Sequence, residues 1–152
     1  LYYGAEVDMA GGDDPEMRAP MRWDLVRDDN PALQWMKRLV ALHQQHRALR
    51  VGNYRPITAN QLFAFERYTD RVADTVLVIV NPGDETITET VMVANSKLMD
   101  STRMLDLLGT HRGQELRMSA ALLDVSLPAK GVLVLKPDTT PPGGYTNYKR
   151  VQ

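Results

Sequence analysis

The stretch LYYGAEVDMAGGDDPEMRAPMRWD, residues 1–24, decides how this chain is organised. It opens with the apolar run Leu1–Tyr3, whose aromatic residues are typical of a strand that stops at Gly4. The loop that follows brings the stretch to three glycines and two prolines, so no helix can run through its middle. Enzymes built on parallel sheets and barrels hold ligands with charged loops that leave the carboxyl ends of strands. This stretch therefore predicts a strand followed by a ligand-contacting loop.

Three motifs in this stretch resemble one region of the α-amylase superfamily of glycoside hydrolases. They are YYGAE at 2–6, GGDDP at 11–15 with Arg18 after it, and PMRWD at 20–24. In that family, the region is the eighth strand of the catalytic barrel and the loop that follows it. Asp14-Pro15 with Arg18 four residues after the Asp is most similar to the cyclomaltodextrinase and neopullulanase branch. The resemblance covers residues 1–136 and is most specific in the loop.

The resemblance assigns a substrate-binding role to Asp14 and Arg18. In the cyclomaltodextrinase branch, the matching pair contacts a sugar away from the point of cleavage. Carboxylate and guanidinium groups supply the directional hydrogen bonds that sugar hydroxyls need. The alternative is an ion pair that only shapes the loop. Glu6 matches the Gly-X-Glu signature of the family, which shapes the loop and takes no part in the chemistry.

The residues that perform catalysis in the family have no counterpart here. The nucleophilic Asp, the general-acid Glu and a third, transition-state-stabilising Asp lie on earlier strands of the family's barrel. Retaining hydrolysis needs two carboxyl groups about 5 Å apart on either side of the scissile bond. None of the family motifs that carry these three catalytic carboxylates occurs in the sequence. We therefore expect a C-terminal fragment of a parent glycosidase, with no catalytic residue of its own and no activity alone.

Composition agrees with a fragment of that kind. The 152 residues suffice for one ordinary domain, whereas a (β/α)₈ barrel takes about 250 residues. The 18 basic and 19 acidic residues leave a net charge of −1, so we expect neither a nucleic-acid partner nor a membrane. The absence of cysteine excludes disulfides and leaves open a cytoplasmic or an exported bacterial-type parent. The expected partners are the missing N-terminal barrel and, through the parent's cleft, α-glucan oligosaccharides; a homodimer stays open.

The acidic residues of the loop could instead form a calcium site. Oxygen-rich loops suit calcium, and this loop carries Asp8, Asp13, Asp14 and Glu16. Their spacing does not match the twelve-residue calcium loop, which favours a solvated acidic loop. We therefore expect no metal and no cofactor.

A single helix is expected from Pro31 to Arg50, where apolar residues recur at helical spacing. Asn30 is a good N-cap, Pro31 suits the first helical position, and Gly52 ends the segment. By resemblance, this is the last helix of the barrel.

From about Tyr54 the hydrophobic period changes to two. Strands are expected at Gln61–Tyr68, Asp74–Asn81, Glu85–Ala94, Thr102–Leu108, Leu122–Leu127 and Val132–Lys136. Strands at this spacing with no helices between them predict an antiparallel β-sandwich. The expected fold class is thus mainly β, a C-terminal sandwich preceded by the last strand, loop and helix of a barrel. The domains are a barrel remnant at 1–52, the sandwich at 53–138 and an extended tail at 139–152.

The positions of the aromatic residues help to distinguish two possible functions of the sandwich. In the first, the sandwich stabilises the barrel of a hydrolase acting on α-1,4-linked glucans (cyclodextrins, maltodextrins, starch or pullulan). In the second, it is a carbohydrate-binding module for starch or maltodextrin, which would expose aromatic side chains as a stacking platform. Phe63 and Phe65 share one alternating face and are expected in the core, which favours the first function. Exceptions to that reading could be Tyr54, Tyr145 and Tyr148. We also expect Trp23, Tyr2 and Tyr3 to pack rather than to stack on sugars.

Overall fold

The computed structural model describes residues 2–111, 113, 115–140 and 145. The chain divides into two compact units, Leu1–Gln45 and His46–Gln152, and each is described by itself. Within the described residues, no helix is long and apolar enough to cross a membrane. Most of the expected tail, including Tyr148, lies outside the described residues.

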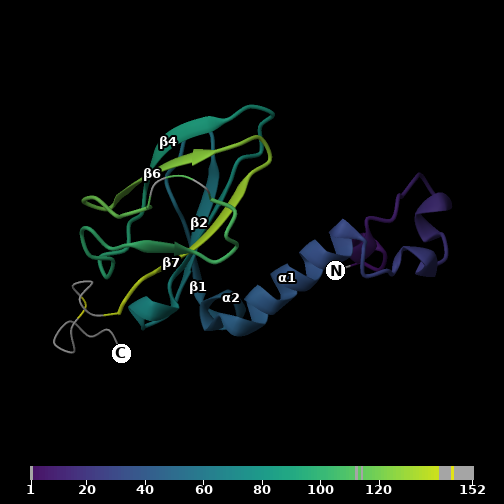
Figure 1. Cartoon of the computed structure of the whole chain (residues 1–152), viewed down its shortest axis with the longest axis horizontal. Coiled ribbons are helices and arrows are strands. Elements are labelled where there is room, and N and C mark those ends of the chain that lie inside the picture. Colours follow the sequence, from purple (N-terminus) through teal and green to yellow (C-terminus); the bar gives the residue numbers. More distant parts are fainter. Residues whose placement is uncertain (1, 112, 114, 141–144, 146–152) are drawn as a thin grey trace. The chain divides into compact units, whose positions relative to one another are not determined.

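The first unit consists of short turns and one helix (Figure 1). Its elements are the 3₁₀ turns η1 (Ala5–Val7), η2 (Glu16–Arg18) and η3 (Trp23–Leu25), and the helix α1 (Pro31–Gln45). Asn30 caps the helix, because its Oδ1 accepts the N–H groups of Ala32 at 2.9 Å and Leu33 at 3.3 Å. Its Nδ2 also donates to the carbonyl of Leu25 at 2.9 Å, which ties the loop to the start of the helix. The predicted cap is confirmed.

The structure differs from the sequence prediction at both ends of this region. Tyr2 and Tyr3 form no strand, and Leu1 lies outside the described residues. A strand needs a partner, and the described residues of this unit contain no other strand. The helix expected from Pro31 to Arg50 is broken at His46, whose backbone is extended at φ −107° and ψ 111°. A second helix, α2 (Arg47–Val51), follows the break.

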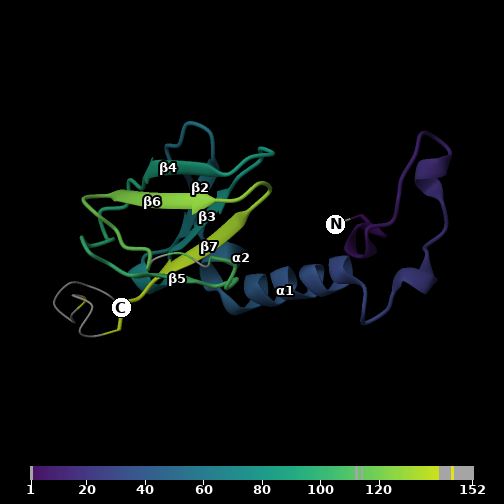
Figure 2. The same ribbon diagram turned by 45° about the horizontal axis from the view of Figure 1, so that its top comes forward.

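The second unit contains two antiparallel sheets (Figures 1 and 2). The larger has the order β1-β2-β3-β7-β5, formed by Asn53–Pro56, Phe63–Tyr68, Val76–Val80, Val132–Pro137 and Met104–Asp106. The smaller pairs β4 (Ile87–Met92) with β6 (Leu122–Leu127), and a 3₁₀ turn, η4 (Val72–Asp74), precedes β3. The mainly β, antiparallel fold is confirmed, while β1 was absent from the predicted strands.

The core of this unit lies between the inward faces of the two sheets. The larger sheet buries Leu77, Ile79, Leu133 and Leu135, and the smaller buries Val91, Leu123, Val125 and Leu127. Tyr145 closes the core beside them, because its hydroxyl accepts the N–H of Met99 at 3.0 Å and lies 2.8 Å from the hydroxyl of Thr102. Tyr145 is therefore a packing residue of the sandwich.

The expectation that Phe63 and Phe65 belong to the core is wrong. Phe63 is 55% exposed and Phe65 is half-buried, whereas Ala64 and Glu66 between and beside them are buried. The strand alternates as predicted, but the opposite face points inward. A carboxylate can occupy the inward face because Asn95 Nδ2 donates to Glu66 Oε2 at 2.9 Å and Arg55 lies 3.0 Å from Oε1.

Candidate functional site

The loop at residues 8–19 is held closed at its base. The Tyr3 hydroxyl donates to the carbonyl of Ala19 at 2.7 Å, across sixteen positions of sequence. Inside the loop, the side chain of Glu16 folds over Gly12, where any Cβ would collide with it. The backbone also curls here, because the N–H of Met17 donates to the carbonyl of Asp13 at 3.2 Å and the N–H of Arg18 donates to that of Pro15 at 2.9 Å. The local chain therefore presents Asp14 and Arg18 together.

Asp14 and Arg18, the two predicted site residues, form a two-point ion pair. Arg18 Nε lies 3.2 Å from Asp14 Oδ1, and Nη2 donates to Oδ2 at 3.3 Å. The Arg18 and Asp14 side chains are 72% and 59% exposed. Exposed pairs contribute about 0–1 kcal/mol to stability, so this one adds little to the fold. The geometry leaves polar atoms of both groups open to solvent, and it fits both a sugar contact and a pair that shapes the loop.

A second ion pair stands a few residues further on. Arg22 donates from Nε to Asp24 Oδ1 at 2.8 Å and from Nη2 to Oδ2 at 2.6 Å. These hydrogen bonds lower the pKa of Asp24 and raise the pKa of Arg22, so both groups stay charged over the neutral range. The sequence analysis did not identify this pair, although opposite charges two residues apart in a loop signal such a contact.

The aromatic side chains of this unit are exposed, contrary to expectation. Trp23 is 75% exposed, Tyr2 63% and Tyr3 43%, and the two tyrosine rings lie 4.7 Å apart. Among the described hydrophobic side chains of the unit, only Val7 and Leu42 are buried. A unit of this size has too little apolar surface to cover its own aromatics.

The acidic residues of the loop do not converge on a metal position. Within the part of the chain that the structure describes, no three His, Asp or Glu side chains are placed to share an ion. Asp14 is engaged by Arg18, and Glu16 turns toward Gly12. Glu6 differs from these residues, because its buried Oε2 atom has no hydrogen-bond partner among the described residues. Buried carboxylate oxygens are almost always partnered in complete folds.

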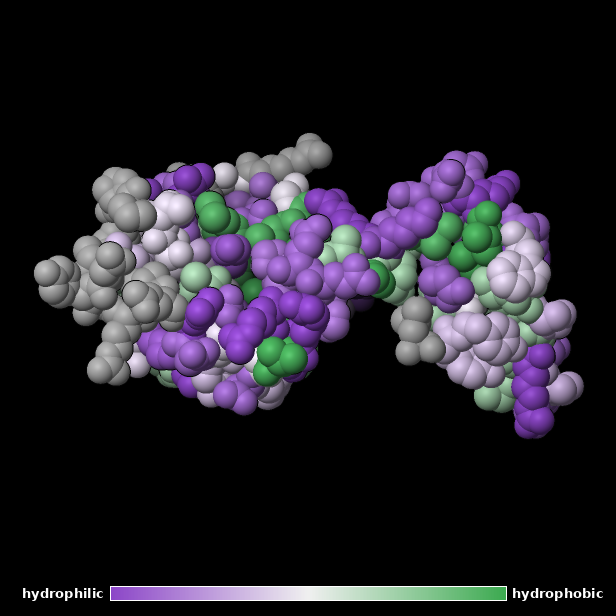
Figure 3. Space-filling view, turned by 90° about the horizontal axis from the view of Figure 1, so that it is seen from below, coloured by the Kyte–Doolittle hydropathy of each residue, from purple (hydrophilic) through white to green (hydrophobic). Residues whose placement is uncertain are grey.

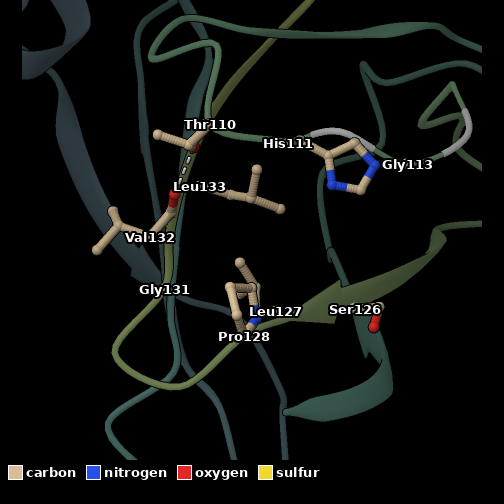
Figure 4. Close-up of a pocket in the computed structure, with 9 residues that line it drawn as sticks. All are labelled: Thr110, His111, Gly113, Ser126, Leu127, Pro128, Gly131, Val132 and Leu133. Carbon is tan, nitrogen blue, oxygen red and sulfur yellow. Dashed lines mark hydrogen bonds between the residues drawn. The ribbon is translucent and has the colours of Figure 1, made fainter.

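A pocket of about 440 Å³ opens in the second unit, at the turn between β6 and β7 (Figure 4). Leu127, Leu133 and Pro128 give it aliphatic walls, with His111 on one side. The Thr110 hydroxyl donates to the carbonyl of Val132 at 2.9 Å. The residues that line the pocket come from two separate segments, 110–113 and 126–133, so no local sequence motif predicted it. Among the described residues that line it there is no carboxylate of the kind that glycosidases use as acid or nucleophile.

Comparison with known proteins connects the loop and the sandwich to one group of enzymes. No protein-family model matches the chain. It is 31% identical over 135 residues to a cyclomaltodextrinase of Geobacillus thermopakistaniensis, covering 88% of this chain and 22% of that enzyme. It is 36% identical over 70 residues to neopullulanase 2 of Thermoactinomyces vulgaris, covering 44% of this chain and 12% of that enzyme. The chain thus spans less than a quarter of the length of either relative.

A solved structure agrees with these relatives. A cyclomaltodextrinase structure superposes with a TM-score of 0.67 at 28% identity, over 91% of this chain and 23% of that one. The chain is therefore homologous to the C-terminal part of the α-amylase-family glycoside hydrolases, a group that includes cyclomaltodextrinases and neopullulanases.

Proposed function

We propose that this chain is the C-terminal part of a hydrolase that acts on α-1,4-linked glucans such as cyclodextrins, maltodextrins, starch or pullulan. Residues 1–52 would supply the last strand, the substrate loop and the last helix of its barrel. Residues 53–138 would form a sandwich that stabilises the barrel. The observation that carries the proposal is the exposed Asp14–Arg18 pair, because it stands in the loop whose motif resembles the substrate loop of cyclomaltodextrinases.

The pair suits sugar recognition rather than bond cleavage. Arg18 offers several N–H donors in a plane, and Asp14 offers two acceptor oxygens, a combination that matches neighbouring sugar hydroxyls. The three catalytic carboxylates would come from earlier strands of the barrel, so the chain alone should be inactive.

The incomplete packing of the first unit supports a barrel as the missing neighbour. Glu6 Oε2 is buried without a donor among the described residues, and Trp23 exposes three quarters of its surface. Viewed from below, the protein shows hydrophobic side chains in each unit among hydrophilic ones (Figure 3). A barrel would supply both a donor for the carboxylate and an apolar surface for these side chains.

The test compares the 152-residue chain with the longer protein that we propose contains it, called the intact hydrolase below. Reducing-sugar release from β-cyclodextrin, maltotriose and pullulan is measured for both. We expect hydrolysis by the intact hydrolase alone. Hydrolysis by the 152-residue chain, or none by the intact hydrolase, would contradict the proposal.

A carbohydrate-binding module is the second candidate, and one observation favours it. Phe63 and Tyr54, at 55% and 54% exposure, lie on the surface of the larger sheet with Phe65 between their rings. Aromatic rows of this kind can stack on sugar rings. An NMR titration of the labelled chain with maltotriose tests it: shifts confined to Tyr54, Phe63 and Phe65 would support the module, whereas shifts at Asp14, Arg18 and Trp23 would place the sugar at the loop.

A further inference from the structure

The sandwich has one edge where two chain segments begin to pair and then separate. Ser119 and Leu122 exchange both backbone hydrogen bonds, at 2.8 and 2.9 Å, around a tight turn. Its central residues, Ala120 and Ala121, have φ of 47° and 69°, as in the type I′ turn that joins the strands of a hairpin. Among the described residues, no further backbone hydrogen bond joins the two arms of this hairpin. The arms therefore diverge and leave a groove along β6.

This groove, called here the β6 groove, consists of two adjoining cavities of about 340 and 440 Å³. They adjoin because His111, Gly113 and Ser126 line both of them. The larger is the aliphatic pocket described above (Figure 4). The smaller has a polar lining that includes Thr88, Glu115, Arg117, Asp124 and Ser126. Volumes of this order are those of small-molecule sites.

The backbone of β6 turns unpaired hydrogen-bonding groups toward the groove. Leu122 directs both of its backbone hydrogen bonds away from β4, whereas Ala121 accepts from Val93, on the β4 side, at 2.8 Å. Because backbone groups alternate sides along a strand, those of Asp124 and Ser126 point away from β4 as those of Leu122 do. No hydrogen bond from the described residues reaches the N–H or C=O of either one. These two residues thus offer two donors and two acceptors to a ligand.

The charges beside the groove have both signs. Glu115 Oε1 lies 2.6 Å from Arg103 Nε, and Glu115 Oε2 lies 2.7 Å from Arg117 Nη2, so this carboxylate is compensated. Asp124 adds one exposed carboxylate, whose Oδ1 accepts the hydroxyl of Thr90 at 2.6 Å. Such a groove has no single-sign field that would select a phosphorylated or strongly charged ligand. It favours a neutral ligand that is rich in hydrogen-bonding groups.

We propose that the β6 groove binds a short stretch of α-glucan. Sugar hydroxyls both donate and accept hydrogen bonds, which suits the unpaired backbone groups of Asp124 and Ser126. The hydroxyls of Thr88 and Ser126, 2.9 Å apart, add two further partners. The aliphatic walls of the larger cavity suit the C–H faces of a sugar ring. The inference rests on the proposed function, which names α-glucans as substrates, and goes further by assigning a second glucan contact to the sandwich.

The short length of the free edge favours a sugar over a polypeptide strand. A strand that adds to a sheet edge gains its affinity from a row of main-chain hydrogen bonds. On β6 this row is limited to Asp124 and Ser126, because the turn engages Leu122 and because Pro128, just after the strand, has no N–H. A row of this length matches a compact ligand of a few sugar rings.

The experiment titrates the isotope-labelled 152-residue chain with maltoheptaose, an α-1,4-linked glucan, and with cellohexaose, a β-1,4-linked one. Amide shifts in NMR spectra locate the contact and give dissociation constants. Ser126→Glu places a charge in the groove, Asp124→Ala removes its exposed carboxylate, and Ser126→Thr keeps the hydroxyl. Phe63→Ala is the control, because it removes an exposed ring from the larger sheet. Unfolding temperatures establish that each variant is folded, and light scattering gives the molecular mass of the wild type.

We expect maltoheptaose to shift the amides of Arg117, Asp124 and Ser126, and cellohexaose to shift them little, since groups fixed on a strand match one arrangement of hydroxyls. Ser126→Glu and Asp124→Ala should each weaken maltoheptaose binding about tenfold, as the loss of one or two hydrogen bonds does. Ser126→Thr and Phe63→Ala should change it by less than about twofold.

Several results would overturn the inference. Groove amides that stay unshifted in excess maltoheptaose would remove the site, and equal shifts with cellohexaose would remove its assignment to α-glucans. Loss of binding in Phe63→Ala but not in Ser126→Glu would place the glucan on the larger sheet. A dimeric wild type whose Asp124 and Ser126 amides resist hydrogen exchange before sugar is added would identify a polypeptide strand as the occupant.

The proposed function fails separately, because its test measures hydrolysis by the intact hydrolase. Glucan binding in the groove without hydrolysis by the intact hydrolase would overturn the enzymatic role and leave the groove as a glucan site. Hydrolysis without binding in the groove would overturn this inference alone.

Discussion

Arg55 and Glu66 face each other across the β1–β2 register, with Arg55 Nη1 at 3.0 Å from Oε1 of a carboxylate that is fully buried. The contact is short, but Oε1 accepts no well-aligned hydrogen bond from the described residues, so charge rather than hydrogen bonding holds it. The Arg55 guanidinium also lies 4.4 Å from the centre of the Tyr68 ring. A strand at the edge of the sheet thereby neutralises a charge in the core.

Removing Arg55 should strongly destabilise the second unit. Arg55→Met leaves the Glu66 carboxylate buried with only Asn95 as a partner among the described residues, a change that costs about 3–5 kcal/mol in comparable sites. Urea unfolding followed by far-UV circular dichroism measures the loss. Glu66→Gln should cost less than Arg55→Met, since it removes the charge and keeps an acceptor for Asn95. A larger loss for Glu66→Gln would contradict this account of the pair.

Glu89 should contribute stability that depends on acid pH. Burial alone would raise its pKa, but three backbone N–H groups, from Asn60, Gln61 and Leu62, donate to its carboxylate and lower the pKa below the ordinary 4.5. A depressed folded-state pKa stabilises the protein above about pH 4.5, and this contribution is lost as pH falls through the folded-state value. Glu89→Gln should therefore cost about 1 kcal/mol at pH 7 and much less near pH 3.

The measurement for Glu89 is urea unfolding of both proteins between pH 3 and pH 7. Asp124→Asn is the matched control, because Asp124 is an exposed carboxylate that accepts one hydroxyl hydrogen bond at 2.6 Å. It should lower stability less than Glu89→Gln does at pH 7. Equal losses for Glu89→Gln at both pH values would contradict the assignment.

His46, at the break between α1 and α2, should titrate below its ordinary pKa. Burial is the larger cause of the lowered pKa, and the positive charge of Lys136 is the smaller. The folded state therefore resists protonation of His46, so stability should fall as pH drops below about 6.5, the unfolded value. NMR titration of the imidazole C–H should give a midpoint below that value. Lys136→Gln should raise the midpoint only partly, and a full return to 6.5 would contradict burial as the main cause.

The loop pair should affect substrate affinity but not stability. In the intact hydrolase, Asp14→Ala or Arg18→Ala should raise KM for maltotriose roughly tenfold, since a hydrogen bond from a charged group contributes about 1.5–3 kcal/mol and exposure favours the low end. Unfolding temperatures should stay within about 1–2 °C of wild type, because exposed ion pairs add little. Steady-state kinetics on maltotriose and a cyclodextrin test the prediction.

The Arg27–Asp29 pair provides the control for the loop. Arg27 Nε lies 3.3 Å from Asp29 Oδ1, and both side chains are as exposed as those of the predicted site. Arg27→Ala should leave KM unchanged. An equal rise in KM for Arg27→Ala would mean that loop charge in general, and not the Asp14–Arg18 pair, attracts substrate.

Local signals in the sequence were reliable where neighbours in the chain decide the outcome. Asn30 caps α1, and the alternating segments from Phe63 to Pro137 became antiparallel strands, with β6 matching its expected bounds, Leu122–Leu127. Asp14 and Arg18 meet because four residues of a tight turn bring them together. These features depend on hydrogen bonds and sterics within a few residues, which the sequence specifies directly.

The sequence by itself therefore determined the element types, the antiparallel β class and the resemblance to a glucan hydrolase. The tertiary structure decided which face of β2 points inward, where the helix breaks at His46, and that β1 joins the sheet. The alternating pattern of β2 does not tell whether the face with Phe63 or the face with Glu66 points into the core. The choice between them depends on Asn95, which is distant in the chain, and on Arg55 of β1, because burial of a carboxylate is favourable only when partners from elsewhere in the fold reach it.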